Sequence, residues 1–316
     1  MTAITRTPIG RRGAGSGSGS GSASPVRSAK SRRTRRERKS VILTIALWAS
    51  ALYFLLPLLW LLFAATKDDS DLFTTFGLWF GRAVALFTNL GTVFTYEDGS
   101  FGTWLLNSAF YAVASALGAV ILATLAGYAF AKYRFRGGRG IFSVVLGSIM
   151  IPSTALALPT YLLFANINIT NTPWAVILPS MVNPFALYLI RVYAVEAVDD
   201  NLIEAARIDG AGEFRIFWQI ASRLLGPAIV TVFLLALVGT WNNYFLPLIM
   251  LNQSSLYPIT VGLAQWAASS NAGGGARVLF STVITGSFVS IIPLVLSFLY
   301  LQRYWQSGLA AGSVKG

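Results

Sequence analysis

Cysteine and histidine are both absent from this 316-residue chain. Their absence excludes disulfides, thiolate and imidazole metal ligands, and the side chain that most often acts as a general base. A nucleotide-binding phosphate loop is missing as well, because it needs Gly-Lys followed by Ser or Thr, and no glycine precedes any lysine here. Any uphill work in which this chain takes part therefore needs energy from a partner.

Charged residues are also scarce. They make up 11% of the chain, against about 25% in an ordinary soluble domain, and 55% of the residues are hydrophobic. This composition predicts a membrane protein with several spans. The net charge of +12 is concentrated in residues 1–40, where eleven Lys and Arg against Glu37 give +10, leaving +2 for the remainder. The basic charge therefore describes a tail, and we expect no nucleic-acid partner.

Residues 1–40 are expected to form a disordered cytoplasmic tail. A Gly/Ser-rich run over residues 13–22 has the composition of a flexible linker, and the basic stretch RSAKSRRTRRERKS follows it. Such a stretch could bind anionic lipid or nucleic acid, or it could hold the N-terminus in the cytoplasm as a topology signal. Its place directly before an apolar run favours the topology signal.

Apolar runs of membrane-spanning length fill residues 41–316, which we predict to be one transmembrane domain. Basic residues gather in the 132–139 connection and near both ends of the chain, so both termini are expected in the cytoplasm, and the 66–103 and 252–277 connections outside. The predicted fold is an all-α polytopic membrane protein with six transmembrane helices, at residues 41–65, 104–131, 141–165, 173–195, 224–251 and 278–301.

No ionisable residue lies in these six runs away from their ends. A carrier coupled to protons or sodium usually keeps a carboxylate or histidine at membrane depth, and an ion channel often shows a charged ring or a filter sequence. A membrane-embedded enzyme would have to use the acids at 68–71 or 196–213, yet no paired-carboxylate or metal-ligand spacing is present. We therefore predict no catalytic residue and no metal site, and keep a channel or an embedded enzyme as less favoured alternatives.

The polar stretch between the fourth and fifth runs, residues 201–226, indicates two short helices with a glycine corner. Asn201 is a candidate N-cap, with Glu204 completing a capping box. Asp209-Gly210 should stop the first helix, since glycine adopts the left-handed conformation cheaply. The second helix is expected to place four residues on one face, namely Phe214, Phe217, Trp218 and Ala221.

This stretch resembles the EAA loop of the permease subunits of bacterial binding-protein-dependent ABC importers. That pattern has Glu-Ala-Ala, three residues, Gly, nine residues and Ile, and it is matched by Glu204-Ala205-Ala206, Gly210 and Ile220, with Asp209 before the glycine. The resemblance covers residues 41–316. Within the family, the chain most specifically resembles the six-span permease of the maltose-importer type, in the carbohydrate-uptake branch. Two departures concern the loop: Ser222-Arg223 stands where the family has Leu-Pro, and Asp199-Asp200 stands where it often has proline.

The resemblance implies a bacterial inner-membrane subunit that is not itself an enzyme and binds no cofactor. A separate ABC ATPase dimer would carry ATP and Mg²⁺ and receive the loop helix, with Glu204 fixing its start, Ala205 and Ala206 allowing close approach, and Gly210 setting the corner. A second permease, most simply a different chain, and an external solute-binding protein complete the implied set. The tail would reach between the ATPase subunits through Gly312, Ser313, Val314, Lys315 and Gly316.

The solute path is indicated by amides within the fourth and fifth runs. Asn183, Asn242, Asn243 and Tyr244 need partners in an apolar surrounding, so they either bond neighbouring helices or line a wet passage. A neutral passage lined by amides and hydroxyls would suit an uncharged sugar or oligosaccharide. Glycerol phosphodiesters and polyols, which other members of the same branch carry, remain alternatives.

Overall fold

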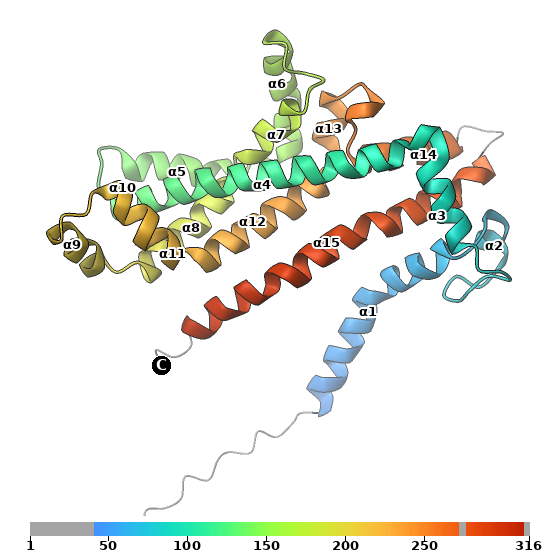
Figure 1. Cartoon of the computed structure of the whole chain (residues 1–316), viewed down its shortest axis with the longest axis horizontal. Helices are drawn as coiled ribbons and strands as arrows, with labels where there is room; N and C mark the ends of the chain where they lie inside the picture. The colour runs from blue at the N-terminus through green and yellow to red at the C-terminus, as the bar shows by residue number, and fades with distance from the viewer. Residues whose placement is uncertain (1–40, 272–275, 313–316) are drawn as a thin grey trace, which may run out of the picture. The chain divides into compact units, whose positions relative to one another are not determined.

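The computed structural model describes residues 41–271 and 276–312, with side chains within 41–270 and 279–304. The tail assigned to residues 1–40 and the predicted ATPase contacts Ser313–Gly316 lie outside the described residues. The described residues divide after Ser50 into two units, and the contacts below all lie within the second unit. Every regular element in the described ranges is a helix (Figure 1).

Both long apolar helices and short connecting helices occur along the chain. Before and along the second span they are α1 (Val41–Ala65), α2 (Asp69–Thr74), α3 (Leu86–Thr95), η1 (Tyr96–Gly99) and α4 (Ser100–Lys132). The third and fourth spans hold α5 (Gly138–Ser148), α6 (Ser153–Asn166), α7 (Trp174–Met181) and α8 (Pro184–Ala197). Then come α9 (Asp200–Ile208), α10 (Glu213–Ile216), the π-helical turn η2 (Phe217–Ala221), α11 (Ser222–Leu224), α12 (Gly226–Trp241), α13 (Phe245–Met250), η3 (Ser254–Leu256), α14 (Ile259–Asn271) and α15 (Ala276–Gly312).

Four helical stretches in the described residues are long and apolar enough to cross a membrane, and six are if each sharply bent pair is one span. The first coincides with the predicted run 41–65. The predicted third run is α5 and α6, which meet at an angle of 104°. The predicted external connections are not simple loops, because 66–103 contains α2 and α3, and 252–277 contains α14.

The breaks in the apolar runs occur where proline and asparagine interrupt the sequence. Pro152 precedes α6, and Pro184 takes the first position of α8, where its missing N–H costs no helical hydrogen bond. Asn183 caps α8, since its Oδ1 accepts a hydrogen bond of 3.0 Å from the amide of Ala186. α12 ends at Trp241, and α13 begins at Phe245, with three residues between them. The break before α8 is therefore closed by a side-chain cap, whereas α6 begins without one.

α4 is the central helix of the second unit and packs along both α8 and α12 (Figure 1). Small residues on its surface permit the close approach: Ala119 and Ala123 are buried, and a Cβ added at Gly127 would lie 2.8 Å from Cβ of Ile190 and 2.9 Å from the carbonyl oxygen of Leu187. These three small residues, spaced four apart, therefore form a helix-packing surface.

The first half of α4 also forms hydrogen bonds to a segment that is not regular α-helix. Indole Nε1 of Trp104 donates to the Ser254 carbonyl at 2.9 Å, the Asn107 amide to the Ser255 carbonyl at 2.8 Å, and the Tyr111 hydroxyl to the Leu256 carbonyl at 2.8 Å. Oγ of Ser108 accepts from the amide of Ile259 at 2.7 Å. We call residues 254–259 the braced segment, because α4 side chains supply hydrogen bonds that regular helix would otherwise provide.

Candidate coupling site

The predicted loop helix is present as α9, but it begins earlier than expected. Its N-cap is Asp199, whose Oδ1 accepts from the amide of Asn201 at 2.9 Å. The prediction that Asn201 is the N-cap, with Glu204 in a capping box, is therefore wrong. Asp199, Asp200 and Asn201 are all good capping residues, and the extended backbone of the buried residue Val198 places the helix start at the first of them.

The predicted stop at Asp209-Gly210 is confirmed. Asp209 is the C-cap, and Gly210 has φ of +81°, the left-handed conformation. The amide of Gly210 donates to the Arg207 carbonyl at 3.0 Å, and the amide of Ala211 donates to the Ala206 carbonyl at 2.9 Å. This pair of bonds is a Schellman motif, which fixes the direction in which the chain leaves α9.

The two alanines of the motif face different surroundings. Ala206 is 8% exposed and packs with Ile203 into an apolar cluster that includes Ile216 and Phe217. Glu204 and Ala205 are exposed. Of the two small residues predicted to admit a partner, only Ala205 is on a surface that a partner can reach, while Ala206 holds α9 against its own chain.

The second helix buries a different face from the predicted one. Phe217 and Ala221 are buried, as expected, but Phe214 is 79% exposed and Trp218 65%. Their rings stack on each other with centroids 6.4 Å apart and planes 5° apart. The buried stripe is centred instead on Ile216, Phe217 and Ala221, so grouping all four residues on one face was wrong. An exposed aromatic pair results.

A lysine from α4 holds the start of α9. Lys132 Nζ donates to Oδ1 of Asp200 at 2.7 Å and to the carbonyl oxygen of Val198. The Lys132 side chain is 6% exposed and that of Asp200 78%. The hydrogen bond from Lys132, followed by its charge, lowers the pKa of Asp200 below its ordinary value of 3.8. Asp200 is therefore ionised at neutral pH, and the end of the second span is bonded to the start of α9.

A second polar contact joins α4 to α10 across the same corner. The Tyr133 hydroxyl donates to Oε2 of Glu213 at 2.7 Å, and Arg207 Nε donates to Oε1 of Glu213 at 2.6 Å. Burial, followed by the bond to the Glu213 carboxylate, raises the pKa of Tyr133, so its hydroxyl remains a donor. Glu213 therefore links α9, α10 and the end of α4.

The sequence gives no signal for these contacts. Lys132 is 68 residues from Asp200 and Tyr133 is 80 residues from Glu213. In the sequence, Lys132 reads only as one of several cations in a basic connection, and nothing in the spacing indicates which of them turns back toward the later helices.

The residues predicted for a solute path lie at the helix breaks. Asn183 caps α8, and the Oδ1 of Asn243 accepts from the Leu246 amide at 3.4 Å while its carbonyl accepts from the Thr260 hydroxyl at 2.8 Å. Asn242 is exposed and Tyr244 is 42% exposed. Asn183 and Asn243 thus bond backbone groups at the interruptions, and the passage role of all four stays a prediction.

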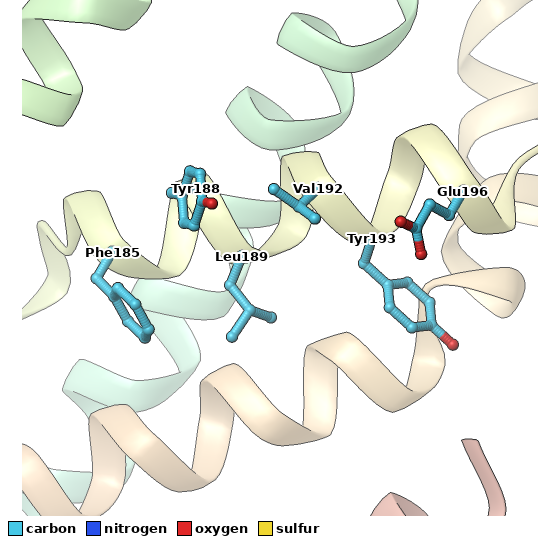
Figure 2. A pocket seen from close by; sticks show the side chains of 6 residues that line it. All are labelled: Phe185, Tyr188, Leu189, Val192, Tyr193 and Glu196. Carbon is cyan, nitrogen blue, oxygen red and sulfur yellow. The ribbon is translucent and has the colours of Figure 1, made fainter. Parts of the chain in front are cut away.

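α8 carries two further features. A hollow of about 200 Å³ runs along one face, lined by Phe185, Tyr188, Leu189, Val192, Tyr193 and Glu196 (Figure 2). Arg191 lies inside the candidate span Trp174–Ala197, with its guanidinium 4.2 Å from the centroid of the Phe142 ring and no hydrogen-bond partner for its buried Nε. In the sequence Arg191 reads as a span-end residue, so a cation packed on an aromatic ring was missed. No group of three acids that could hold a metal occurs in the described residues.

These features define a class: an all-helical protein with several membrane spans and a short capped helix bonded to the end of one of them. The chain belongs to the binding-protein-dependent transport system inner membrane component family, which matches residues 119–309. The family predicted from the 204–220 motif is thereby confirmed. The chain is a multi-pass membrane component of a transport system, and family membership implies ATPase and binding-protein partners in general.

Similar proteins extend over nearly the whole chain. It is 33% identical to the arabinooligosaccharides transport system permease protein AraQ of Halalkalibacterium halodurans, over 88% of this chain and 97% of that protein. Identity to the lactose transport system permease protein LacG of Rhizobium radiobacter is 28%, over 89% and 98%. The sn-glycerol-3-phosphate transport system permease protein UgpE of Yersinia pestis is 29% identical, over 84% and 94%.

A solved structure shares the fold. It is a bacterial ABC transporter involved in the import of the acidic polysaccharide alginate, which aligns with a TM-score of 0.73 at 22% identity and covers 84% of this chain and 95% of that chain. This chain and that chain therefore share a fold.

Proposed function

We propose that this chain is a permease subunit of an ATP-driven importer and forms half of the path for a neutral sugar or oligosaccharide. The observation that carries the proposal is the similarity to the arabinooligosaccharide permease at 33% identity over 88% of the chain. The lactose permease supports the same solute class. The sn-glycerol-3-phosphate permease favours a second candidate, a glycerol phosphate ester.

ATP hydrolysis is assigned to a separate pair of ATPase subunits that carry ATP and Mg²⁺, since this chain has no phosphate-binding loop. The docking element is α9, with Glu204 and Ala205 on its exposed surface and Asp209-Gly210 setting its exit. The tail from Gly312 to Gly316 adds a second ATPase contact. The α9 end of the protein and both termini then lie in the cytoplasm, in accord with the basic residues of the 132–139 connection.

The remaining partners follow from the same orientation. A second, different permease completes the path, and a solute-binding protein docks outside on the 66–103 and 252–277 connections. Described helices lie in both connections, α2 and α3 in the first and α14 in the second, and their surfaces are available for docking.

The alanine pair tests the docking assignment. Ala205→Trp adds an indole on the exposed face of α9 and should prevent co-purification of the ATPase while the permease still reaches the membrane. Ala206→Trp is the matched comparison, because the same side chain enters the buried cluster around Ile203 and should lower the amount of folded permease. An Ala205→Trp chain that retains its ATPase would contradict docking on this face.

Reconstitution tests the solute. The complete complex in vesicles, supplied with its binding protein and ATP, should accumulate a labelled arabino-oligosaccharide or disaccharide and leave glycerol phosphate outside. Uptake of glycerol phosphate in place of any sugar would establish the second candidate. Loss of uptake on omitting ATP separates the importer from a channel.

A further inference from the structure

α4 contacts the coupling site at one end and the braced segment at the other. At its last residues, Lys132 bonds Asp200 and the carbonyl of Val198, and Tyr133 bonds Glu213. At its first residues, Trp104, Asn107 and Tyr111 bond the carbonyls of the braced segment. A single 33-residue helix therefore has polar contacts to both regions.

The contact at the coupling end is apolar as well as polar. The ring of Tyr128 lies 5.2 Å from that of Phe217 between centroids, and Tyr128 is 3% exposed. The same cluster contains Ile203 and Ala206 of α9 and Val198 before it. The end of α4 therefore contacts both α9, through Lys132 and Asp200, and η2, through Tyr128 and Phe217.

The neighbouring spans are less suited to carry a displacement across the protein. The third is bent by 104° between α5 and α6, the fourth is interrupted at Val182 and Asn183, and the fifth at Asn242–Tyr244. Such breaks are positions where a helix can hinge. α4 runs from Ser100 to Lys132 as one helix with no proline inside it, so a movement of one end has to move the other.

We propose that α4 transmits the displacement of α9 to the braced segment, and that Lys132 and Tyr133 are the positioning residues that join α9 and α10 to it. The proposal rests on the proposed function, since it assumes an ATPase that moves α9. It gives the polar end of α4 a role in communication between the ATPase and the outer face, where solute arrives. Because coupling is reciprocal, solute-loaded binding protein on the outer face acts on the ATPase by the same route.

Removal of each contact should uncouple hydrolysis from solute. In the complete complex, Lys132→Met keeps an unbranched apolar chain and loses the ammonium group, and Tyr133→Phe loses a single hydroxyl. Both should retain basal ATP hydrolysis and reduce its stimulation by solute-loaded binding protein about fivefold or more, the lower range for allosteric coupling. Lys132→Arg keeps a donor and the charge, and should restore most of the stimulation.

A matched control is available in the same connection. Arg136 is an exposed cation near the end of α4, so Arg136→Met removes an equal charge and should leave the stimulation unchanged. A second readout follows the far end of the helix directly: hydrogen exchange of the braced-segment amides should change on nucleotide trapping in the wild type and in Lys132→Arg, but not in Lys132→Met.

The outcomes separate this proposal from the proposed function. A wild-type complex whose hydrolysis does not respond to solute-loaded binding protein refutes the importer assignment itself. Normal stimulation in both Lys132→Met and Tyr133→Phe, or an unchanged response of the braced segment in Lys132→Met, refutes only the role of α4. If Lys132→Met lowers the amount of folded protein, Tyr133→Phe decides, because it changes one partly exposed hydroxyl.

Discussion

Gly210 shapes the coupling site through its backbone alone. Its φ is +81°, and a Cβ added there would meet no atom within 4 Å, so a substitution there is opposed by backbone strain and not by crowding. For a β-branched residue that conformation costs about 1–2 kcal/mol or more, whereas asparagine adopts it more readily. Gly210→Val should therefore abolish uptake while the protein still reaches the membrane, and Gly210→Asn should retain most of it.

Uptake of labelled solute, normalised to permease in isolated membranes, checks this pair. Equal uptake by the valine variant and the wild type would show that the corner does not need this geometry, and the coupling assignment would lose its main support. Equal loss in both variants would point instead to a side chain that obstructs the docked partner.

Asp200 makes the stability of the contact between α4 and α9 depend on pH in a defined direction. Its pKa is lowered by the hydrogen bond and then the charge of Lys132, so the native protein binds its proton less tightly than the unfolded chain. The stabilisation is fully present above the unfolded pKa, about 3.8, and is lost as the pH falls through the lower folded value. Since Asp200 is exposed, the effect should be small.

Asp200→Asn isolates this contribution. The melting temperature of the purified variant should lie below that of the wild type by a constant amount between about pH 5 and pH 8, and the two should converge below about pH 4. A gap that widened on acidification would mean that Asp200 is not held in its charged form by Lys132.

At the scale of the helix, the glycines of α4 predict opposite responses to the same substitution. A Cβ added at Gly127 would lie 2.8 Å from Cβ of Ile190 and 2.9 Å from the carbonyl oxygen of Leu187. A Cβ added at Gly102 would meet nothing within 4 Å. Gly127→Ala should therefore separate α4 from α8 and destabilise the protein by about 1–3 kcal/mol, the usual cost of overpacking. Gly102→Ala should be neutral or stabilise by up to about 1 kcal/mol, because alanine is the better helix former.

Thermal unfolding of both variants in the same detergent provides the measurement. The comparison cancels the effect of helix propensity, which favours alanine at both positions. A Gly127→Ala variant as stable as Gly102→Ala would show that the α4–α8 contact yields easily, and α4 could then not act as a firm link.

The helices themselves were largely predictable from the sequence, because an apolar run of spanning length leaves few alternatives. The first span matched the predicted residues 41–65. The N-cap of α9 was harder to predict. Asp199, Asp200 and Asn201 are all suitable N-cap residues, and the buried position of Val198 in the fold selects Asp199. Pro152 and Pro184 lie at breaks in the structure, but a proline in a sequence does not specify an angle such as the 104° between α5 and α6.

Long-range pairing was beyond the sequence. The Trp104 indole and the Ser254 carbonyl are 150 residues apart, and a backbone carbonyl carries no residue-specific signal. Lys132 and Asp200 are 68 residues apart, and nothing in the sequence indicates which cation of the 132–139 connection bonds Asp200. The position of the coupling element could therefore be predicted from a motif, while its attachment to α4 required the fold.

At the scale of the whole molecule, the distribution of carboxylates determines which energy source can work. The twelve acids of the chain comprise Glu37 and three groups, at 68–71, 97–98 and 196–213. The groups at 68–71 and 196–213 adjoin α1 and α9, and Glu97 bonds the Trp266 indole at 2.9 Å. Glu97 and Asp98 lie at the kink between α3 and α4. No acid among the described residues lies at the breaks within the third, fourth and fifth spans, where a coupling ion would be bound together with solute.

An ion gradient alone should therefore drive no accumulation. The complete complex in vesicles, with its binding protein outside, should accumulate solute when ATP is sealed on the ATPase side, and should not respond to an imposed proton or sodium gradient in the absence of ATP. An ionophore that collapses both gradients is the control, and it should leave ATP-driven uptake unchanged. Accumulation under a gradient without nucleotide would require a carboxylate to move into the membrane interior. It would contradict a permease whose movement is driven only by an ATPase docked on α9.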